Sequence, residues 1–328
     1  MQEMQRNKLI LAINAIISVV IIYFILQFIG VDKFLNEISK VDLVLLGISI
    51  LFLLFMYVLM SLRIKILLEE QGVKATWIEV IRSHFVGMLA ADFTPARSGY
   101  FATAGMLHYK YNVPSEKAFV SVMGPTVFDF ALKVLAGSTA IVYLLWQFLK
   151  PEDKPILVFA SFAMITMIII MVLILFSKKF LGLFSFAKTI PLANKVYDLF
   201  ERMQQNSHAV IKRTPELLGI LSLTWSAKAI SWYFAAKSVG ITIDAGMPEV
   251  LFYFLFQPLI TMIEFAPLPS FAGTGFSEGF AAVVLGLFGI PVAKGITFAL
   301  LTRFKTIAVN LIAVPDAINM LLKGGSKK

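Results

Sequence analysis

Six apolar stretches dominate the sequence, covering residues 9–29, 43–62, 118–149, 156–176, 217–238 and 292–322. A helix of about 20 apolar residues is long enough to cross the hydrocarbon core of a bilayer, and every stretch reaches that length. Only 15% of the 328 residues are charged, against about 25% in a soluble domain. The sequence therefore predicts a single all-α integral membrane domain over residues 1–328, with six membrane-spanning helices and no soluble catalytic domain.

Two further apolar regions, 78–109 and 248–289, are interrupted near their middles. The interrupting residues of interest are prolines and glycines, namely Pro95, Gly99, Pro267, Pro269, Gly273 and Gly275. Such residues leave backbone groups without partners, and lipid cannot satisfy them, so each break must be buried in protein or line a wet cavity. We interpret both regions as re-entrant helical hairpins.

Basic residues are distributed unevenly among the connecting segments. They precede the first span, end the chain, fill the central linker 178–213, and surround the first interrupted region as Arg63, Lys65, Lys74 and Lys110. The segments 32–42, 151–155 and 241–249 are poor in them. The positive-inside rule then predicts a multi-pass protein of the cell (cytoplasmic) membrane with both termini in the cytoplasm.

The net charge of +9 is accordingly interpreted as a topology signal and as contact with anionic lipid, and nucleic acid is not expected as a partner. Within the linker 178–213, apolar residues recur at roughly helical spacing among the basic ones. This pattern favours a helix lying at the membrane interface. The alternative is an ordinary solvated linker helix.

The two interrupted regions are similar to each other. Each opens with Glu-Val and closes with an apolar-Pro pair, followed three residues later by Lys117 or Lys294. We therefore divide the sequence into two repeat halves, about 43–149 and 217–322. In the predicted topology they have opposite orientations in the membrane, so the repeat is inverted. Inverted repeats with broken helices are typical of transporters. The alternative is that these short matches arise by chance in apolar sequence.

Charged residues inside apolar segments are expensive, at least ~2.5–3.5 kcal/mol each on insertion scales, and are therefore candidates for function. Asp92 flanks the first break. The predicted substrate-binding residues are Arg97, Asp129, Lys133, Glu264, Glu278, Arg303 and Lys305. Asp129 and Lys133 are four residues apart, so they share a helix face and can pair. Lys228 and Lys237 are expected to snorkel or to flank a helix end.

These positions predict a polar cavity between the hairpins. Its arginines and lysines would attract an anionic head group, because the planar guanidinium suits phosphate oxygens. Its carboxylates would balance those charges, or bind a cationic head group or a coupling proton. The alternative is a structural ion-pair network that fixes the hairpins in place.

Motifs for catalysis or cofactor binding are weak. Residues 275–279 match G-x-S-x-G, but all three histidines lie upstream of the serine, whereas the hydrolase order places the base downstream. The histidines have no metal-ligand spacing, there are no cysteines, and no Walker or dinucleotide motif occurs. We therefore expect no enzyme activity, no cofactor and no metal site.

At its two breaks the sequence resembles the lysylphosphatidylglycerol synthase transmembrane family, also described as flippase-like. Pro95, Arg97, Gly99 and Asp129 match the first family motif. The second motif and the arginine that follows it are matched by Pro267, Pro269, Gly273, Gly275, Glu278 and Arg303. The sequence departs from the pattern at Tyr100, at Thr126 and in the Ser270-Phe271-Ala272 run. These departures leave the identity of the head group open.

The resemblance implies movement of aminoacylated phospholipid between leaflets, and relatives are associated with hopanoid or polyprenyl-linked sugar pathways. This sequence lacks the soluble aminoacyl-transferase domain of the full-length synthases, so lysyl transfer is not implied. We predict a flippase for a phospholipid or a polyprenyl-linked head group. The alternatives are a membrane scaffold that partners a glycosyltransferase or lipid-modifying enzyme and, more remotely, a small-solute transporter. The oligomeric state stays open.

Overall fold

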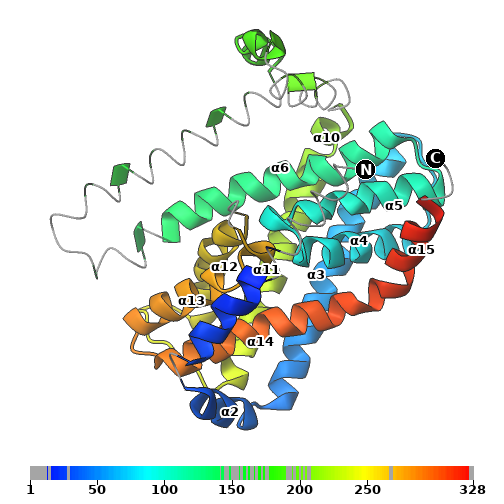
Figure 1. Ribbon diagram of the computed structural model, residues 1–328. Helices are drawn as coiled ribbons and strands as arrows, with labels where there is room; N and C mark the ends of the chain where they lie inside the picture. The colour runs from blue at the N-terminus through cyan, green and yellow to red at the C-terminus, as the bar shows by residue number, and fades with distance from the viewer. Residues whose placement is uncertain are drawn as a thin grey trace.

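The computed structural model describes residues 16–27, 30–140, 177–189, 208–265 and 269–324, together with scattered single residues elsewhere. Every regular element within these residues is a helix (Figure 1). The predicted all-α class is therefore confirmed for this part of the chain.

Three helices of the described residues are long and apolar enough to cross a membrane: α3 (Leu43–Glu70), α6 (Ser115–Ala140) and the stretch Val292–Met320. A fourth span results if residues 16–27 and α2 (Val31–Ser39), which are bent by 88° relative to each other, count as one. The predicted span at 217–238 corresponds to α11 (Thr214–Ser238), a 25-residue helix that is not among these. The span at 156–176 lies largely outside the described residues, so the number of six stays a prediction.

The C-terminal span is built from three consecutive elements. α14 (Val292–Asn310) leads through the short η6 (Leu311–Ala313) into α15 (Val314–Gly324). Asp316 of α15 accepts hydrogen bonds from Arg82 and Lys110, which come from the two arms of the first interrupted region. The end of the chain is thereby attached to that region.

Helix starts follow from capping residues in the sequence. The Asp42 carboxylate accepts hydrogen bonds from the backbone N–H groups of Val44 (2.8 Å) and Leu45 (3.0 Å) and so begins α3. α4 (Trp77–Asp92) begins with a capping box, in which Thr76 and Glu79 each bond the other's backbone N–H. Both caps fix where a long helix leaves its loop.

The first interrupted region folds back on itself as α4, η1 (Pro95–Phe101) and α5 (Ala102–Tyr111). Ala96 and Arg97 adopt left-handed φ values of 51° and 52° at the tip. Gly99 packs directly against α4, where an added Cβ would lie 2.2 Å from the carbonyl oxygen of Ala90. Only glycine allows so close an approach, which is the structural reason for the break's composition.

The second interrupted region has the same order: α12 (Glu249–Phe265), η5 (Phe271–Gly273) and α13 (Phe276–Leu287). Pro267 lies outside the described residues, and Pro269 is exposed just before η5. Ala272, Gly273 and Gly275 have φ values of 44°, 71° and 88°. This break therefore also turns through left-handed backbone, as the first one does.

The two hairpins enter the molecule from opposite ends and meet at their tips. α4 begins and α5 ends near the end of α3 at Glu70, whereas α12 begins beside the end of α11, where Lys237 pairs with Glu249 at 2.5 Å. At the centre, the N–H of Ala272 donates to the carbonyl of Thr94 at 3.2 Å. The tips of both hairpins are thus in direct contact.

α3 and α11 lie side by side along the middle of the molecule, and each is followed by its hairpin and then by a long helix (Figure 1). The element order is the same in both halves. The orientation of this repeat relative to a membrane stays a prediction.

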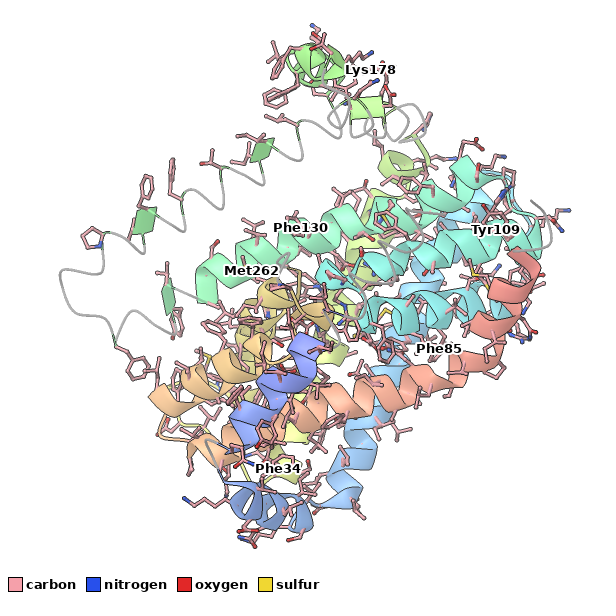
Figure 2. All side chains as sticks on the ribbon, in the orientation of Figure 1. Phe34, Phe85, Tyr109, Phe130, Lys178 and Met262 are labelled. Atoms are coloured by element: carbon pink, nitrogen blue, oxygen red, sulfur yellow. The ribbon has the colours of Figure 1, made fainter. Side chains whose placement is uncertain are left out.

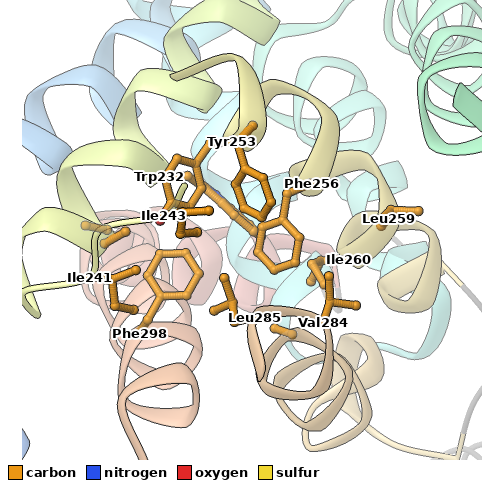
Figure 3. Packing of buried hydrophobic residues seen from close by; sticks show 14 of the residues in the cluster. Trp232, Ile241, Ile243, Tyr253, Phe256, Leu259, Ile260, Val284, Leu285 and Phe298 are labelled. Atoms are coloured by element: carbon orange, nitrogen blue, oxygen red, sulfur yellow. The ribbon is translucent and has the colours of Figure 1, made fainter. Parts of the chain in front are cut away.

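The largest core cluster lies in the second half, where α11, α12, α13 and α14 contribute interlocking aromatic and aliphatic side chains (Figure 3). Trp232 contacts Phe256 and Phe298 edge-on, with ring centroids 5.9 and 5.7 Å apart. By contrast, large apolar residues such as Leu43 (76% exposed) and Val283 (64%) lie on the outside. Figure 2 labels another exposed ring, that of Tyr109. An apolar exterior over a packed interior is expected where lipid is the solvent.

The central linker contains three short described elements: α8 (Lys178–Gly182), η4 (Ser185–Thr189) and α10 (His208–Lys212). α10 is docked on the helical body, because Val210 belongs to a buried cluster with Leu67 and Leu217. Most of residues 190–207 lie outside the described part. The interfacial position of the linker therefore stays a prediction.

Candidate functional site

A cavity of about 160 Å³ lies at the centre of the molecule, where the two hairpin tips meet α3, α6, α11 and α14. At about 30 Å³ per water in the liquid, it has room for roughly five water molecules. Its wall contains every one of the seven residues predicted as substrate-binding, Arg97, Asp129, Lys133, Glu264, Glu278, Arg303 and Lys305. Residues from four different helices and a hairpin tip are thereby brought together.

Arg97 projects from the strained tip of the first hairpin and is 13% exposed. Its Nη1 donates to Oε2 of Glu264 at 3.1 Å, and its Nη2 donates to Oδ1 of Asp92 at 3.3 Å. Asp92 also accepts a hydrogen bond of 2.5 Å from Nδ2 of Asn310. Arg97 therefore connects the first hairpin to α12, the first arm of the second.

Arg303 of α14 plays the corresponding part at the second break. Its Nε donates to Glu278, its Nη2 donates to Oγ of Ser277 at 2.7 Å, and the same nitrogen lies 3.7 Å from Glu264. Glu278 in addition accepts the N–H of Gly275 at 2.6 Å and so caps α13. Because Glu264 is shared by Arg97 and Arg303, one ion-pair network links both breaks.

The bidentate partner of Asp129 is Arg63, one of the basic residues predicted to surround the first interrupted region. Nη1 and Nη2 of Arg63 donate to Oδ1 and Oδ2 of Asp129, both at 3.0 Å, and Arg63 is only 2% exposed. Arg63 was expected in the basic segment that follows a helix ending at 62, but it lies within α3, which continues to Glu70. No Pro or Gly occurs between residue 62 and Gly72, and this was the signal for the longer helix. Lys133 also acts electrostatically on Asp129.

The interpretation of Lys228 as a residue that snorkels or flanks a helix end is also wrong. Lys228 lines the cavity instead of snorkelling outward, donates to Oγ1 of Thr261 at 3.0 Å, and lies 5.7 Å from the ring centroid of Trp232. Its neighbour along α11, Lys237, does lie at the helix end, where it pairs with Glu249. Position along α11 does not by itself show which of the two lysines faces the cavity. That depends on which other helices pack against each face of α11.

Lys305 is 5% exposed and its ammonium group is held between α3 and α11. It donates to Oγ of Ser49 and, at 2.9 Å, to Oγ of Ser231. These serines also bond each other's backbone, since each hydroxyl donates to the carbonyl oxygen of the other residue (2.6 and 2.7 Å). Lys305 thus connects α3 and α11 at the point where these helices are in contact.

Two of the three departures from the family pattern, Tyr100 and Thr126, also lie at the cavity. The hydroxyl of Tyr100 is 3.4 Å from Nδ1 of the fully buried His84, and the hydroxyl of Thr126 donates to the carbonyl of Val122 at 2.9 Å. The serine of the G-x-S-x-G match, Ser277, bonds Arg303 and Glu278 and no histidine. Among the described residues, no group of three His, Asp or Glu could hold a metal ion.

The family model for the lysylphosphatidylglycerol synthase TM region matches residues 11–313. The chain belongs to this family. The match spans both breaks and every charged residue of the cavity, and it confirms the resemblance found at the motifs. No curated protein matches the sequence. Membership identifies the chain as a multi-pass membrane protein of a family concerned with lipid modification or transport.

Proposed function

We propose that this protein is a lipid transporter that moves the head group of a phospholipid or of a polyprenyl-linked lipid from one leaflet to the other through the central cavity. The observation that supports it is the meeting of two broken hairpins, entering from opposite ends, at one cavity that contains all the predicted charged residues. Broken helices at the interface of two repeats are a recurring architecture of transporter binding sites.

The wall of the cavity contains both charged and apolar side chains. The charged residues come from the breaks and from helices such as α6, α12 and α14. The apolar residues include Leu53, Met56, Met60 and Met88. A head group needs polar partners, because a charge in hydrocarbon is costly, whereas acyl or prenyl tails need none. A cavity with both kinds of residue suits a molecule that has both parts.

In the proposed cycle, the head group passes through the cavity while the tails remain in lipid, and the hairpins or their flanking helices rock to open it to alternate sides. Both hairpins are proposed to re-enter the membrane, with both termini in the cytoplasm of the cell. The shared carboxylate of Glu264 would have to exchange partners between Arg97 and Arg303 as the tips move. Asp129, Glu264 and Glu278 are the groups able to carry a coupling proton. No covalent chemistry is proposed for this chain.

Reconstitution tests this function. The purified protein is placed in proteoliposomes with a fluorescent phospholipid or prenyl phosphate, and a membrane-impermeant reductant reports how much label reaches the outer leaflet. We expect flipping by the unaltered protein and at least a tenfold loss with Glu264→Gln, which removes the shared charge but keeps the shape of the side chain.

A control variant removes a lysine of the exposed Lys65–Glu69 pair on α3, Lys65→Ala, and should flip normally. Unchanged melting temperatures in detergent show that the variants are folded. Two results together would contradict transport: no labelled lipid is flipped by the unaltered protein, and Glu264→Gln leaves the cellular phenotype intact. They would favour the alternative, a scaffold that partners a membrane enzyme.

A further inference from the structure

Lys228 and Lys305 differ from the arginines of the cavity in the kind of partner they bind. The hydrogen bonds of Lys228 and Lys305 go to uncharged oxygens, those of Thr261, Ser49 and Ser231. The carboxylates of the cavity are bound by arginines: Asp92 by Arg97, Asp129 by Arg63, Glu264 by Arg97 and Arg303, and Glu278 by Arg303.

The count of basic and acidic side chains around the cavity also favours a bound anion. Six basic side chains gather at or directly behind the cavity wall against four carboxylates. The basic residues are Arg63, Arg97, Lys133, Lys228, Arg303 and Lys305, and the acidic ones are Asp92, Asp129, Glu264 and Glu278. The cavity therefore has a positive excess, and an anion would neutralise it.

The two lysines are also close enough to act on each other. Lys228 and Ser231 are three residues apart on α11 and share a helix face, and Ser231 binds Lys305. Both lysines also line the same cavity. Burying an ion without a counter-ion is unfavourable by several kcal/mol, so an anion that reaches both ammonium groups would stabilise them.

An independent feature of the same wall is an unsatisfied hydroxyl. Thr302 lines the cavity, is 7% exposed, and its Oγ1 has no hydrogen-bond partner among the described residues. It precedes Lys305 by three residues on α14, so both project from the same face of that helix. Buried polar groups are normally hydrogen-bonded, and this one is therefore a donor available to a ligand.

We propose that Lys228, Lys305 and Thr302 form an oxyanion subsite that takes a phosphate group of the transported lipid. This inference rests on the proposed function and assigns a place to the head group within the cavity. A phosphate has several acceptor oxygens and can accept from two ammonium groups and a hydroxyl at once. The arginines remain bound to carboxylates and hold the hairpin tips together. Both a phosphodiester of a phospholipid and the diphosphate of a prenyl carrier supply this chemistry.

Direct binding to the purified full chain tests the subsite. Trp225 and Trp232 line the cavity, so their fluorescence reports what enters it. The probes are short-chain phosphatidylglycerol for a phosphodiester, farnesyl diphosphate for a prenyl carrier, and short-chain diacylglycerol as the ligand without phosphate. We expect one or both phosphate probes to bind and diacylglycerol to bind at least tenfold more weakly.

Each of Lys228→Met and Lys305→Met should weaken the phosphate probe by at least tenfold, because a hydrogen bond to a charged group is lost. Thr302→Val should weaken it by about two- to tenfold. Matched controls come from the same helices: Lys237→Met on α11 and Lys294→Met on α14, neither of which lines the cavity, should bind as the unaltered protein does.

Two results would overturn the subsite: phosphate binding that survives both cavity-lysine substitutions in folded protein, or equal binding of diacylglycerol. Both can occur while reconstituted flipping persists, so they leave the transport function standing. Conversely, loss of phosphate binding in the two lysine variants supports the subsite. It does so even if the unaltered protein flips no lipid in liposomes, because absence of flipping would contradict only the transport step.

Discussion

At the scale of single residues, the Arg63–Asp129 pair is the interaction whose loss should be most damaging. Both side chains are buried and bonded twice, at 3.0 Å. Arg63→Met leaves the carboxylate of Asp129 buried without its bidentate partner, which typically lowers stability by about 3–5 kcal/mol. We expect a clear fall in the melting temperature of the purified protein in detergent.

The matched control for this prediction is Lys65→Met, two residues further along α3. Its ion pair with Glu69 is partly solvent-exposed, and such pairs contribute less than about 1 kcal/mol. The double variant Arg63→Met with Asp129→Leu should recover much of the loss, because no unpaired charge remains. A melting temperature for Arg63→Met equal to that of Lys65→Met would contradict the prediction.

Most of the charged residues that line the cavity could be predicted from the sequence, with Lys228 as the exception, whereas their partners could not. Charge within an apolar segment is so unfavourable that Arg97 or Glu278 is informative by position alone. Pairing is different: Arg63 and Asp129 are 66 residues apart, and Arg97 and Glu264 are 167 apart. Neither helical periodicity nor composition predicts the tertiary packing that brings such residues together.

At the scale of elements, the tip of the first hairpin depends on a close approach of two backbones. An added Cβ on Gly99 would lie 2.2 Å from the carbonyl oxygen of Ala90 and 2.3 Å from its carbonyl carbon. Backbone atoms cannot move aside as a flexible side chain can, so Gly99→Ala should destabilise the protein by roughly 1–3 kcal/mol through overpacking. The melting temperature and the flipping rate should both fall.

Gly47→Ala on α3 is the comparison, because nothing lies within 4 Å of the added Cβ. Alanine is favoured over glycine in a helix interior by about 0.5–1 kcal/mol, so this variant should be as stable as the parent or more stable. Equal stability of Gly99→Ala and Gly47→Ala would show that the tip relaxes without strain.

The positions of both breaks were readable from their prolines and glycines, but the helix ends around them were less so. α3 extends eight residues beyond the predicted end at 62, since no breaker occurs until Gly72. The left-handed backbone at Ala96 and Ala272 was not predictable from residue type, because alanine rarely adopts it. At the second break, Ala272 lies at the contact of the two tips, where its N–H donates to the carbonyl of Thr94, a tertiary contact that residue type does not predict.

At the scale of the whole molecule, the chain has two ends separated by the length of α3. A 28-residue helix rises about 42 Å at 1.5 Å per residue. One end gathers the start of α3 and the end of α11, where the N–H of Asp42 donates to the carbonyl of Ser238 at 2.9 Å. The other gathers the loops after α3 and α5, where Nζ of Lys117 donates to the carbonyl of Gln71 at 2.7 Å.

This arrangement allows the predicted membrane topology to be tested with single cysteines, because the chain contains none of its own. Asp244→Cys lies at the end poor in basic residues, and Ser115→Cys lies at the opposite end, and both positions are exposed. The positive-inside rule predicts that a membrane-impermeant maleimide labels Asp244→Cys on intact cells and labels Ser115→Cys only after permeabilisation. The reverse labelling would invert the topology but keep the two ends apart. Labelling of both positions from one side would contradict a membrane-spanning α3, and with it the proposal that the hairpins enter from opposite faces.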